Sequence, residues 1–527
     1  MTPDLRETWT VRKPAVRSNR GVVSTQHHVA SEVGARVLAE GGNAVDAAVA
    51  AGLALGTVEP WMSGLGGCGQ MVVHLAGEGR AWSVDFGLVA SRHLDPADYP
   101  LDEGRGSDLF NWPAVAGDRN VMGPLSIAVP TWVAGAAAAL ERFGTRSWAD
   151  CIAPAAELAE RGLVADWYAT LKIASTAARL AADDECRRVY LPDGFPPCSE
   201  WGGPPPRLRL GRLAETLRRL GQAGPRDFYE GEIARSLVAD AERLGAKLAP
   251  DDLAEVEVRI REALAIRHGG ATVHAAPGLT GGPSLARALG LFAERRAEAR
   301  GDGPETEADV ALAYAGALST AWAERLATLG HDAEAAMPAC TTHLSVVDRE
   351  GNLVALTQTL LSLFGSRVMF PATGVLMNNG VMWFDPRPGR PNSIGPGRRP
   401  LANMCPVVVE RAGGDRFALG ASGGRRIMPA VMQLVSFLVD FGLDLEDAFH
   451  APRIDASGGE FVTVDPRFDP AVAAALRERY PVEACPNAVY PAMYACPNGA
   501  GALEDGGRVG AAYVMSPWAL AAPAEPA

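Results

Sequence analysis

The residues best suited to chemistry are Thr341 and Thr342, at the start of a predicted strand. A threonine hydroxyl is a poor nucleophile unless a base lies beside it. If the chain were cut before Thr341, the new α-amino group would be that base, since an α-amine titrates near about 7.7–8.0. Two β-branched residues at a strand start also need no catalytic role. The dipeptide by itself therefore leaves both interpretations open.

A second candidate is the glycine pair Gly423 and Gly424, between a predicted strand and a predicted helix. Glycine allows the backbone to approach a ligand closely, so the two amides could stabilise an oxyanion. A glycine turn before a helix could equally hold a phosphate or be a plain turn. The pair alone does not decide among these three interpretations.

The elements around Thr341 form a predicted β-hairpin, with strands over 343–347 and 353–359 and a turn over 348–352. Strand alternation places His343 on the same face as Thr341. We interpret His343 as a structural hydrogen-bonding residue, because the α-amine already supplies a base. The sequence leaves the roles of His27 and His28 undecided.

Other patterns predict a mixture of helices and short strands. Asn43 is a suitable N-cap for a helix that begins at Ala44. The segment 115–270 is rich in helix signals, and 295–307 reads as a charged surface loop. The remaining predicted helices are 30–40, 309–329 and 426–441, and the remaining predicted strands are 71–74, 81–86, 375–377, 407–410 and 416–419.

Composition indicates a large core and excludes some functions. Of the 527 residues 48% are hydrophobic, and the net charge is -13, which argues against binding to nucleic acid. Residues 1–20 lack the apolar core of a secretory signal, and the richest apolar run, 44–56, is too short to span a bilayer. We therefore expect a cytoplasmic protein without a membrane partner. The eight scattered cysteines contain no C-x-x-C pair and indicate buried thiols.

The residues after position 340 resemble the nucleophile segment of the γ-glutamyltransferase family. That segment has the pattern T-T-H-x-S-V-V-D-x-x-G-N followed by T-x-T, which the chain meets over 341–352 and at Thr357 and Thr359. Similar runs follow in the family's order, and the resemblance covers about residues 20–455. These runs are 41–50, 63–67, 364–366, 374–379, 395–400, 420–427 and 451–453.

The resemblance implies a precursor that cuts itself between Cys340 and Thr341, giving fragments 1–340 and 341–527. It also implies one intertwined domain with the four-layer αββα sandwich of N-terminal-nucleophile hydrolases. By the same resemblance, Thr359 is expected to orient the nucleophile, and the backbone amides of Gly423 and Gly424 are expected to form the oxyanion hole. The implied substrate is a small-molecule amide, with no metal and no organic cofactor, and the two-fragment protomer allows a further dimer.

The chain departs from the family where the glutamate part of the substrate is held. Where the family has an arginine for the substrate α-carboxylate, this chain has Gly87. The family's paired serines are replaced by Ala402 and Asn403, and its aspartate for the α-ammonium is replaced by Trp383. Leu361 stands where the family has an asparagine, two residues after the Thr359 position. Gly380 replaces the family's amide-bearing residue after Asn378–Asn379. A buried ammonium without a partner is costly, so we expect γ-glutamyl groups to bind poorly.

Five residues are expected to contact the substrate. Arg367 stands where the family commonly has glycine and could clamp a carboxylate, although a solvated arginine at a strand end explains it too. Trp383 could form an apolar wall or be a plain core aromatic. The full set is Leu361, Arg367, Asn379, Trp383 and Asn403.

The leading hypothesis is a self-processing threonine amidohydrolase whose acyl group is not γ-glutamyl. The first alternative is a true γ-glutamyl hydrolase or transferase that uses other contacts. The second alternative is a homologue that binds a ligand without turnover.

Overall fold

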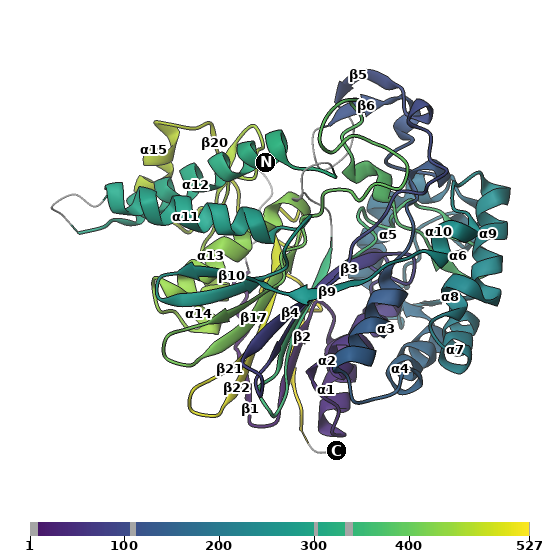
Figure 1. Cartoon of the computed structure of the whole chain (residues 1–527), viewed down its shortest axis with the longest axis horizontal. Coiled ribbons are helices and arrows are strands. Elements are labelled where there is room, and N and C mark those ends of the chain that lie inside the picture. Colours follow the sequence, from purple (N-terminus) through teal and green to yellow (C-terminus); the bar gives the residue numbers. More distant parts are fainter. Residues whose placement is uncertain (1–8, 106–111, 300–303, 332–340, 526–527) are drawn as a thin grey trace.

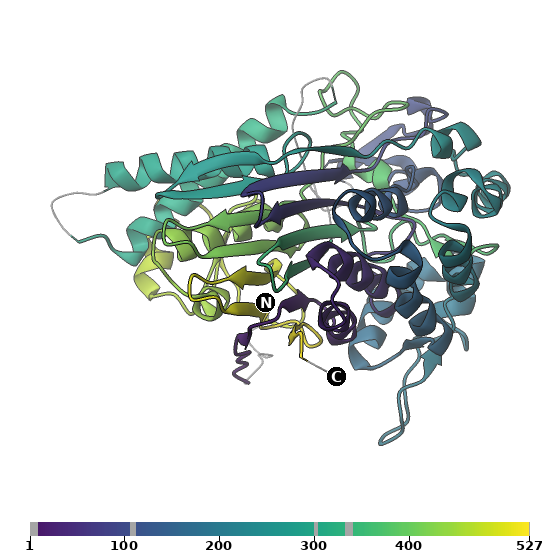
Figure 2. The same ribbon diagram turned by 60° about the horizontal axis from the view of Figure 1, so that its bottom comes forward.

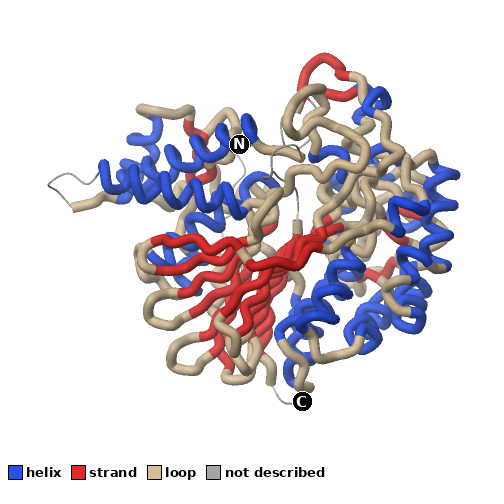
Figure 3. The backbone as a smooth tube through the Cα atoms, in the orientation of Figure 1, coloured by secondary structure: helices blue, strands red, loops and turns tan. Residues whose placement is uncertain are grey.

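The computed structural model describes residues 9–105, 112–299, 304–331 and 341–525. Two seven-stranded sheets stack face to face, and helices cover the outer face of each (Figure 1). Figure 3 shows the strands gathered between the two groups of helices. The αββα architecture predicted from the sequence is confirmed.

The first sheet contains strands from both ends of the chain. In spatial order it consists of β1 (Val16–Ser18), β22 (Arg508–Ala512), β21 (Cys496–Ala502), β17 (Arg416–Ser422), β16 (Val407–Glu410), β11 (Ala271–Ala275) and β10 (Leu264–His268). All of its neighbouring strands pair antiparallel.

The second sheet carries the predicted hairpin at its centre. In spatial order it consists of β23 (Leu520–Pro523), β2 (Val22–Thr25), β12 (Thr342–Val347), β13 (Leu353–Thr359), β3 (Cys68–Leu75), β4 (Arg80–Phe86) and β9 (Arg259–Glu262). Strand β12 pairs with β2 on one side and β13 on the other. Both sheets therefore combine strands from before and after position 340, and the two predicted fragments would be interleaved.

The outer helices pack on the sheets as two separate layers, which Figures 1 and 2 show from two directions. The first sheet is covered by α11 (Gly282–Ala299), α12 (Glu307–Thr328), α13 (Ile427–Val439) and α14 (Leu445–His450), with α15 (Pro470–Arg477) against α12. The second sheet is covered by α1 (His28–Ala39), α2 (Ala44–Val58) and α3 (Trp132–Phe143).

Further helices lie outside α2 and α3. They are α4 (Trp148–Arg161), α5 (Trp167–Leu180), α6 (Asp184–Tyr190), α7 (Leu213–Ala223), α8 (Asp227–Glu230), α9 (Glu232–Leu244) and α10 (Pro250–Ala254). Short strand pairs join this part: β5 (Leu101–Arg105) with β6 (Pro113–Val115), β7 (Leu163–Val164) with β8 (Arg207–Leu208), and β14 (Met369–Phe370) with β15 (Val375–Leu376). A small sheet of β18 (Ile454–Asp455), β19 (Val462–Val464) and β20 (Val482–Ala484) lies beside α15.

The layer between the two sheets is built from small side chains. Alanine and valine dominate it, so the sheets can approach closely and pack without voids. Its fully buried members include Val22, Val72, Ala355, Val408 and Ala418. This apolar layer joins the central strands of both sheets.

The N-cap predicted at Asn43 is confirmed. The Asn43 side chain accepts hydrogen bonds from the amides of Val45 and Asp46, and the Asp46 carboxylate accepts one from the Asn43 amide. This reciprocal capping box fixes the start of α2. Thirteen of the 15 residues of α2 are buried, which agrees with its alanine-rich sequence packing against both a sheet and outer helices.

One local prediction was wrong in part. The segment 295–307 was expected to be a surface loop, but its first residues belong to α11, which ends at Ala299, and Glu307 already opens α12. Residues 304–306 are a connection without helix, as expected, and 300–303 lie outside the described residues. Arg296, at the end of α11, binds Glu305 in this connection and lies over the ring of Phe292.

Two expectations from composition can be compared with the described residues. Among them no helix is both long and apolar enough to cross a bilayer. The seven described cysteines are free thiols and five of them are buried, as predicted; Cys340 lies outside the described residues. The cytoplasmic location stays a prediction.

Candidate active site

Thr341 lies fully buried at the mouth of the central hairpin. Thr342 pairs with Gln358 across β12 and β13, so Thr341 and Thr359 form the next position of the same ladder. Thr359 in turn pairs with Cys68 at the start of β3. The predicted nucleophile and the predicted orienting residue are therefore neighbours at the same end of two central strands.

The face on which Thr341 lies follows from strand alternation. The Ser345 hydroxyl donates to the carbonyl of Asn498 in the opposite sheet, at 3.2 Å. The Thr342 hydroxyl points the other way and donates to Glu59 at the end of α2. Odd-numbered residues of β12 thus face the first sheet, and Thr341 belongs to that inner face.

His343 occupies the interior just behind Thr341. Its Nδ1 lies 2.8 Å from the Thr357 hydroxyl and its Nε2 lies 3.0 Å from the Ser345 hydroxyl. Complete burial lowers the pKa of His343 to about 3, so the ring is neutral. This geometry agrees with the structural role predicted for His343. His27 is also accounted for, because its ring caps α1 by accepting from the Val29 amide.

The glycine pair directly follows β17, a central strand of the other sheet. Gly420 of β17 packs directly on the His343 ring, where a Cβ would come within 2.3 Å of Cε1. The strand ends two residues later at Ser422, and Gly423 and Gly424, which follow it, adopt φ angles of 132° and 63°. These conformations favour glycine. The pair therefore lies toward the same end of the sandwich as Thr341, as an oxyanion hole requires.

Thr359 also holds a strained loop. Its Oγ1 accepts a hydrogen bond from the Leu361 amide at 2.7 Å, and Leu361 has a φ of 84°. Phe364 and Arg367 share this left-handed conformation, which is uncommon for such side chains. Strain of this kind concentrates at functional sites. The loop 361–367 is therefore held in place by its surroundings, including the Thr359 hydroxyl.

The positions that depart from the family gather in one apolar cluster. Leu361, Trp383 and Ala402 pack together there with Cys68 and Met404, all nearly or fully buried. The cluster borders Thr359, because Cys68 is its partner in the ladder. Its side chains carry no carboxylate, amide or hydroxyl oxygen that could accept from an ammonium, and sulfur is only a weak acceptor. The wall beside the predicted nucleophile is apolar.

Two predicted substrate contacts have structural partners. The Asn379 amide donates to the carbonyl of Val121 at 2.7 Å and to the Ser362 hydroxyl at 2.9 Å. Arg367 is 6% exposed, and its Nη1 donates to the same carbonyl of Val121 at 3.0 Å. Both side chains thus fix the loop around position 362. A role for them in binding substrate stays a prediction.

Asn403 is held by an arginine that sequence reasoning missed. Arg325 of α12 is 1% exposed and donates to Asn403 Oδ1 and to the carbonyl of Ala402. Burial lowers the pKa of Arg325 to about 9. The Nδ2 of Asn403 has no partner among the described residues. A buried donor left unpaired in this way costs on the order of 1–3 kcal/mol.

Glu59 is a second residue that the sequence did not reveal. It ends α2, is 3% exposed, and accepts the hydrogen bond of Thr342. Burial raises the pKa of Glu59 to about 7, against hydrogen bonds and the nearby charge of Lys172 that lower it. An acidic residue between an apolar helix and a glycine-rich run was the available signal.

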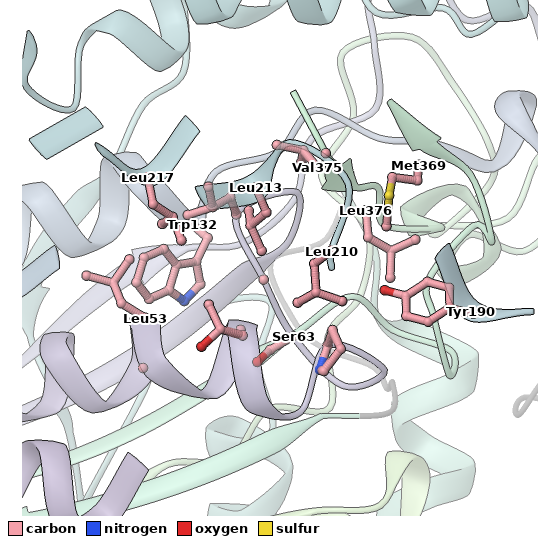
Figure 4. Close-up of a pocket in the computed structure, with 17 residues that line it drawn as sticks. Leu53, Ser63, Trp132, Tyr190, Leu210, Leu213, Leu217, Met369, Val375 and Leu376 are labelled. Carbon is pink, nitrogen blue, oxygen red and sulfur yellow. The ribbon is translucent and has the colours of Figure 1, made fainter. Parts of the chain in front are cut away.

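Two other features of the structure are not sites. Apolar side chains from α2, α3 and the segment 210–217 meet around a narrow crevice, shown in Figure 4, whose water-accessible volume is about 20 Å³. That space holds roughly one water. The exposed His93 and Asp251 and the buried Asp252 could together hold a cation, but Asp252 already accepts from Ser91 and Arg92.

Comparison with known proteins decides the family. The sequence model of Gamma-glutamyltranspeptidase matches residues 30–340 and 315–484. The chain belongs to this family. It is 33% identical over 512 residues to "Acylase ACY 1 proenzyme" of Pseudomonas sp. (strain V22), covering 90% of this chain and 89% of the relative. It is 31% identical over 490 residues to "Glutathione hydrolase proenzyme" of Pseudomonas sp. (strain A14), covering 83% and 82%.

A solved structure agrees with the fold of this gamma-glutamyltranspeptidase-family chain. The cephalosporin acylase from Bacillus halodurans superposes with a TM-score of 0.84 over 99% of both chains, at 22% identity. Family and fold together make the chain an N-terminal-nucleophile amidohydrolase or acyltransferase.

Proposed function

We propose that the chain cuts itself between Cys340 and Thr341 and then uses Thr341 to hydrolyse a small amide whose acyl group is not γ-glutamyl. In the first step the Thr341 hydroxyl attacks the Cys340 carbonyl carbon. The peptide nitrogen leaves as the free amine of Thr341 and an ester remains. Water hydrolyses that ester, and fragments 1–340 and 341–527 result.

The same hydroxyl then attacks the substrate amide. Its proton passes to the α-amine of Thr341, which returns it to the departing amine, and water releases the acid from the acyl-enzyme. The amides of Gly423 and Gly424 would hold the negative oxygen of each tetrahedral intermediate. Such donors are worth about 3–4 kcal/mol each.

One observation carries the assignment of roles. Thr341, Thr359 and the glycine pair come from different parts of the chain, yet strand register and the packing of Gly420 on His343 bring them to one edge of the sandwich. Cys340 lies outside the described residues, so the cut site rests on the position of Thr341 and on relatives named as proenzymes.

The apolar cluster supports the altered acyl group. A γ-glutamyl group needs acceptors for its ammonium, and the described wall of Leu361, Trp383 and Ala402 supplies none. The relatives named acylases are similar to this chain over nine-tenths of its length, which favours such a change.

A true γ-glutamyl enzyme is the second candidate, and the Nδ2 of Asn403 is the observation in its favour, since it could bind an α-carboxylate. A homologue without turnover is the third candidate. The retention of Thr341, Thr359, Gly423 and Gly424 argues against it, because a protein that only binds a ligand does not need the family's nucleophile and oxyanion-hole residues.

Self-cleavage is tested with purified protein on a denaturing gel. The wild-type chain should give two bands, and the small fragment should begin at Thr341 by mass spectrometry. Thr341→Ala should leave one full-length band, whereas the matched Thr342→Ala should still be cut. Cleavage of the Thr341→Ala chain at the same bond would refute the assignment.

The acyl group is tested with p-nitroanilides. We expect faster turnover of simple acyl anilides than of γ-glutamyl p-nitroanilide. A preference for the γ-glutamyl compound would establish the second candidate, and a cleaved protein with no turnover of any anilide would establish the third.

A further inference from the structure

An open pocket lies beside the apolar cluster, at the same edge of the sandwich as Thr341. Its volume is about 210 Å³. Three of its lining residues, Gly87, Trp383 and Ala402, are positions where the chain departs from its family. The remaining lining residues are Gln70, Asp85, Leu88, Arg259, Arg261, Gly278, Leu279, His331, Arg399 and Pro400.

Strand register places the polar floor of this pocket on the inner face of the sheet. Gln70 pairs with Thr357, whose hydroxyl contacts His343 between the sheets. Gln70 also pairs with Asp85, and Asp85 pairs with Arg259. Arg261 follows two residues later and therefore shares this face. The pocket floor and Thr341 thus lie on one continuous surface.

The pocket is rich in guanidinium groups that are incompletely neutralised. Arg261 Nη2 and Arg399 Nη1 lie 3.8 and 3.6 Å from the single carboxylate of Asp85, both beyond hydrogen-bond length. The Asp85 Oδ1 already accepts from Gln70 and from the Gly87 amide. Arg259 has its own partner, Glu257, at 3.2 Å. In the described part of the chain the three guanidinium groups of Arg259, Arg261 and Arg399 thus lie near only two carboxylates, those of Asp85 and Glu257.

Unused hydrogen-bonding atoms line the same pocket. The Nε of Arg261, the Nε1 of Trp383 and the Oε1 of Gln70 are buried and have no partner among the described residues. A buried donor without a partner costs on the order of 1–3 kcal/mol. Two donors beside surplus positive charge favour a ligand with negatively charged oxygen atoms.

We propose that this pocket binds a terminal carboxylate on the acyl group of the substrate, with Arg261 and Arg399 as its main contacts. The inference rests on the proposed function. Gly87 favours it, because it lines the pocket without a side chain, and a Cβ there would come within 3.3 Å of Asp85 Oδ1 and of Gln70 Nε2. The positive charge that the family places after β4 is here supplied from β9 and from the segment 395–400.

The positions also specify the spacer. Strands lie about 4.8 Å apart, so β4 is about 14 Å from β12, and a short acyl group on Thr341 does not span the gap to the two arginines beside Asp85. The apolar cluster lies between the two positions. The acyl group is therefore an extended hydrocarbon chain that ends in a carboxylate, rather than a short amino acid.

The test compares suberyl p-nitroanilide, which ends in a carboxylate, with octanoyl p-nitroanilide, which has the same chain length and a methyl end. In the wild-type protein we expect kcat/KM to be at least tenfold higher for suberyl than for octanoyl, and higher for suberyl than for succinyl. Arg261→Gln and Arg399→Gln should each lower the suberyl-to-octanoyl ratio about tenfold. The control Arg80→Gln, at the far end of β4, should leave that ratio unchanged.

The outcomes separate this inference from the proposed function. Turnover of octanoyl p-nitroanilide with no preference for suberyl, or an unchanged ratio in both pocket variants, overturns the carboxylate site alone. No turnover of either anilide by a cleaved protein overturns both. If a variant does not fold, as judged by loss of self-cleavage, inhibition of the wild-type enzyme decides. Suberate should then inhibit at least tenfold more strongly than octanoate, and equal inhibition would contradict the site.

Discussion

The hydroxyl of Thr342 donates a hydrogen bond to the buried carboxyl group of Glu59, with 3.1 Å between Thr342 Oγ1 and Glu59 Oε2. This bond joins the first residue of β12 to the residue that ends α2. Thr341 precedes Thr342 directly, so the contact fixes the strand next to the predicted nucleophile. It also makes that region sensitive to pH.

Because of Glu59, the protein should become less stable as the pH rises from about 4.5 to about 7. Burial raises the pKa of Glu59 from 4.5 to about 7. The stability that this group contributes is fully present below pH 4.5 and is lost between there and about pH 7, because the unfolded chain releases the proton first. The loss is on the order of 3 kcal/mol.

The variant Glu59→Gln removes this titration. We expect its thermal unfolding midpoint to rise relative to wild type as the pH increases from 4.5 to 8, and to level off above about pH 7. Glu350→Gln, in the exposed turn of the hairpin, serves as the control. A constant difference between Glu59→Gln and wild type across this range would contradict the prediction.

Thr359→Val should slow both self-cleavage and amide hydrolysis. The substitution keeps the shape of the side chain but leaves the buried amide of Leu361 without its acceptor. We expect about 1–3 kcal/mol of lost stability and a fall in kcat of at least tenfold. Thr359→Ser keeps the oxygen and should restore most of the rate. Equal rates for the valine and serine variants would show that the hydroxyl is dispensable.

Gly423→Ala should damage the site through the backbone. Gly423 has a φ of 132°, and a Cβ there would lie 2.7 Å from the Cα of Ala495. We expect a loss of about 1–3 kcal/mol in stability, together with a reduced kcat. In the matched control Gly413→Ala the Cβ meets nothing within 4 Å. Thermal unfolding and anilide turnover of the two variants measure the difference, and similar values would argue against the conformational requirement.

Leu361→Asn should be better tolerated than Leu361→Thr. Both variants place a polar side chain in the apolar cluster, so their burial costs are comparable. The φ of 84° distinguishes them, because asparagine enters the left-handed region more readily than a β-branched residue. We expect the asparagine variant to be more stable by about 1 kcal/mol in chemical unfolding. The reverse order would mean that packing outweighs backbone strain at this position.

Arg325→Met should be strongly destabilising. The guanidinium donates to Thr280, Ser284, Ala402 and Asn403 in the interior, and these acceptors would lose their partner. We expect a loss of about 3 kcal/mol or more in the free energy of unfolding. The exposed Arg287, which pairs with Glu324, gives the comparison, and Arg287→Met should cost less than about 1 kcal/mol. Similar losses in both variants would contradict the importance of burial.

The sequence by itself determined the hairpin that begins at Thr342 and the Asn43 cap with its partner Asp46, because strand alternation and helix capping are local features. The long motif around position 341 indicated the family, and the αββα architecture was implied by that resemblance. It also identified Gly87, Leu361, Trp383 and Ala402 as departures, because each is a change of residue type at a motif position.

Only the tertiary structure decided what those departures form together. Leu361, Trp383 and Ala402 meet in one cluster because sheet register and loop packing bring distant segments to a shared edge, which spacing along the chain does not specify. Arg261 and Arg399 face Asp85 for the same reason. The burial that raises the pKa of Glu59 likewise arises from packing around it, since the charge of an isolated glutamate carries no sign of its final surroundings.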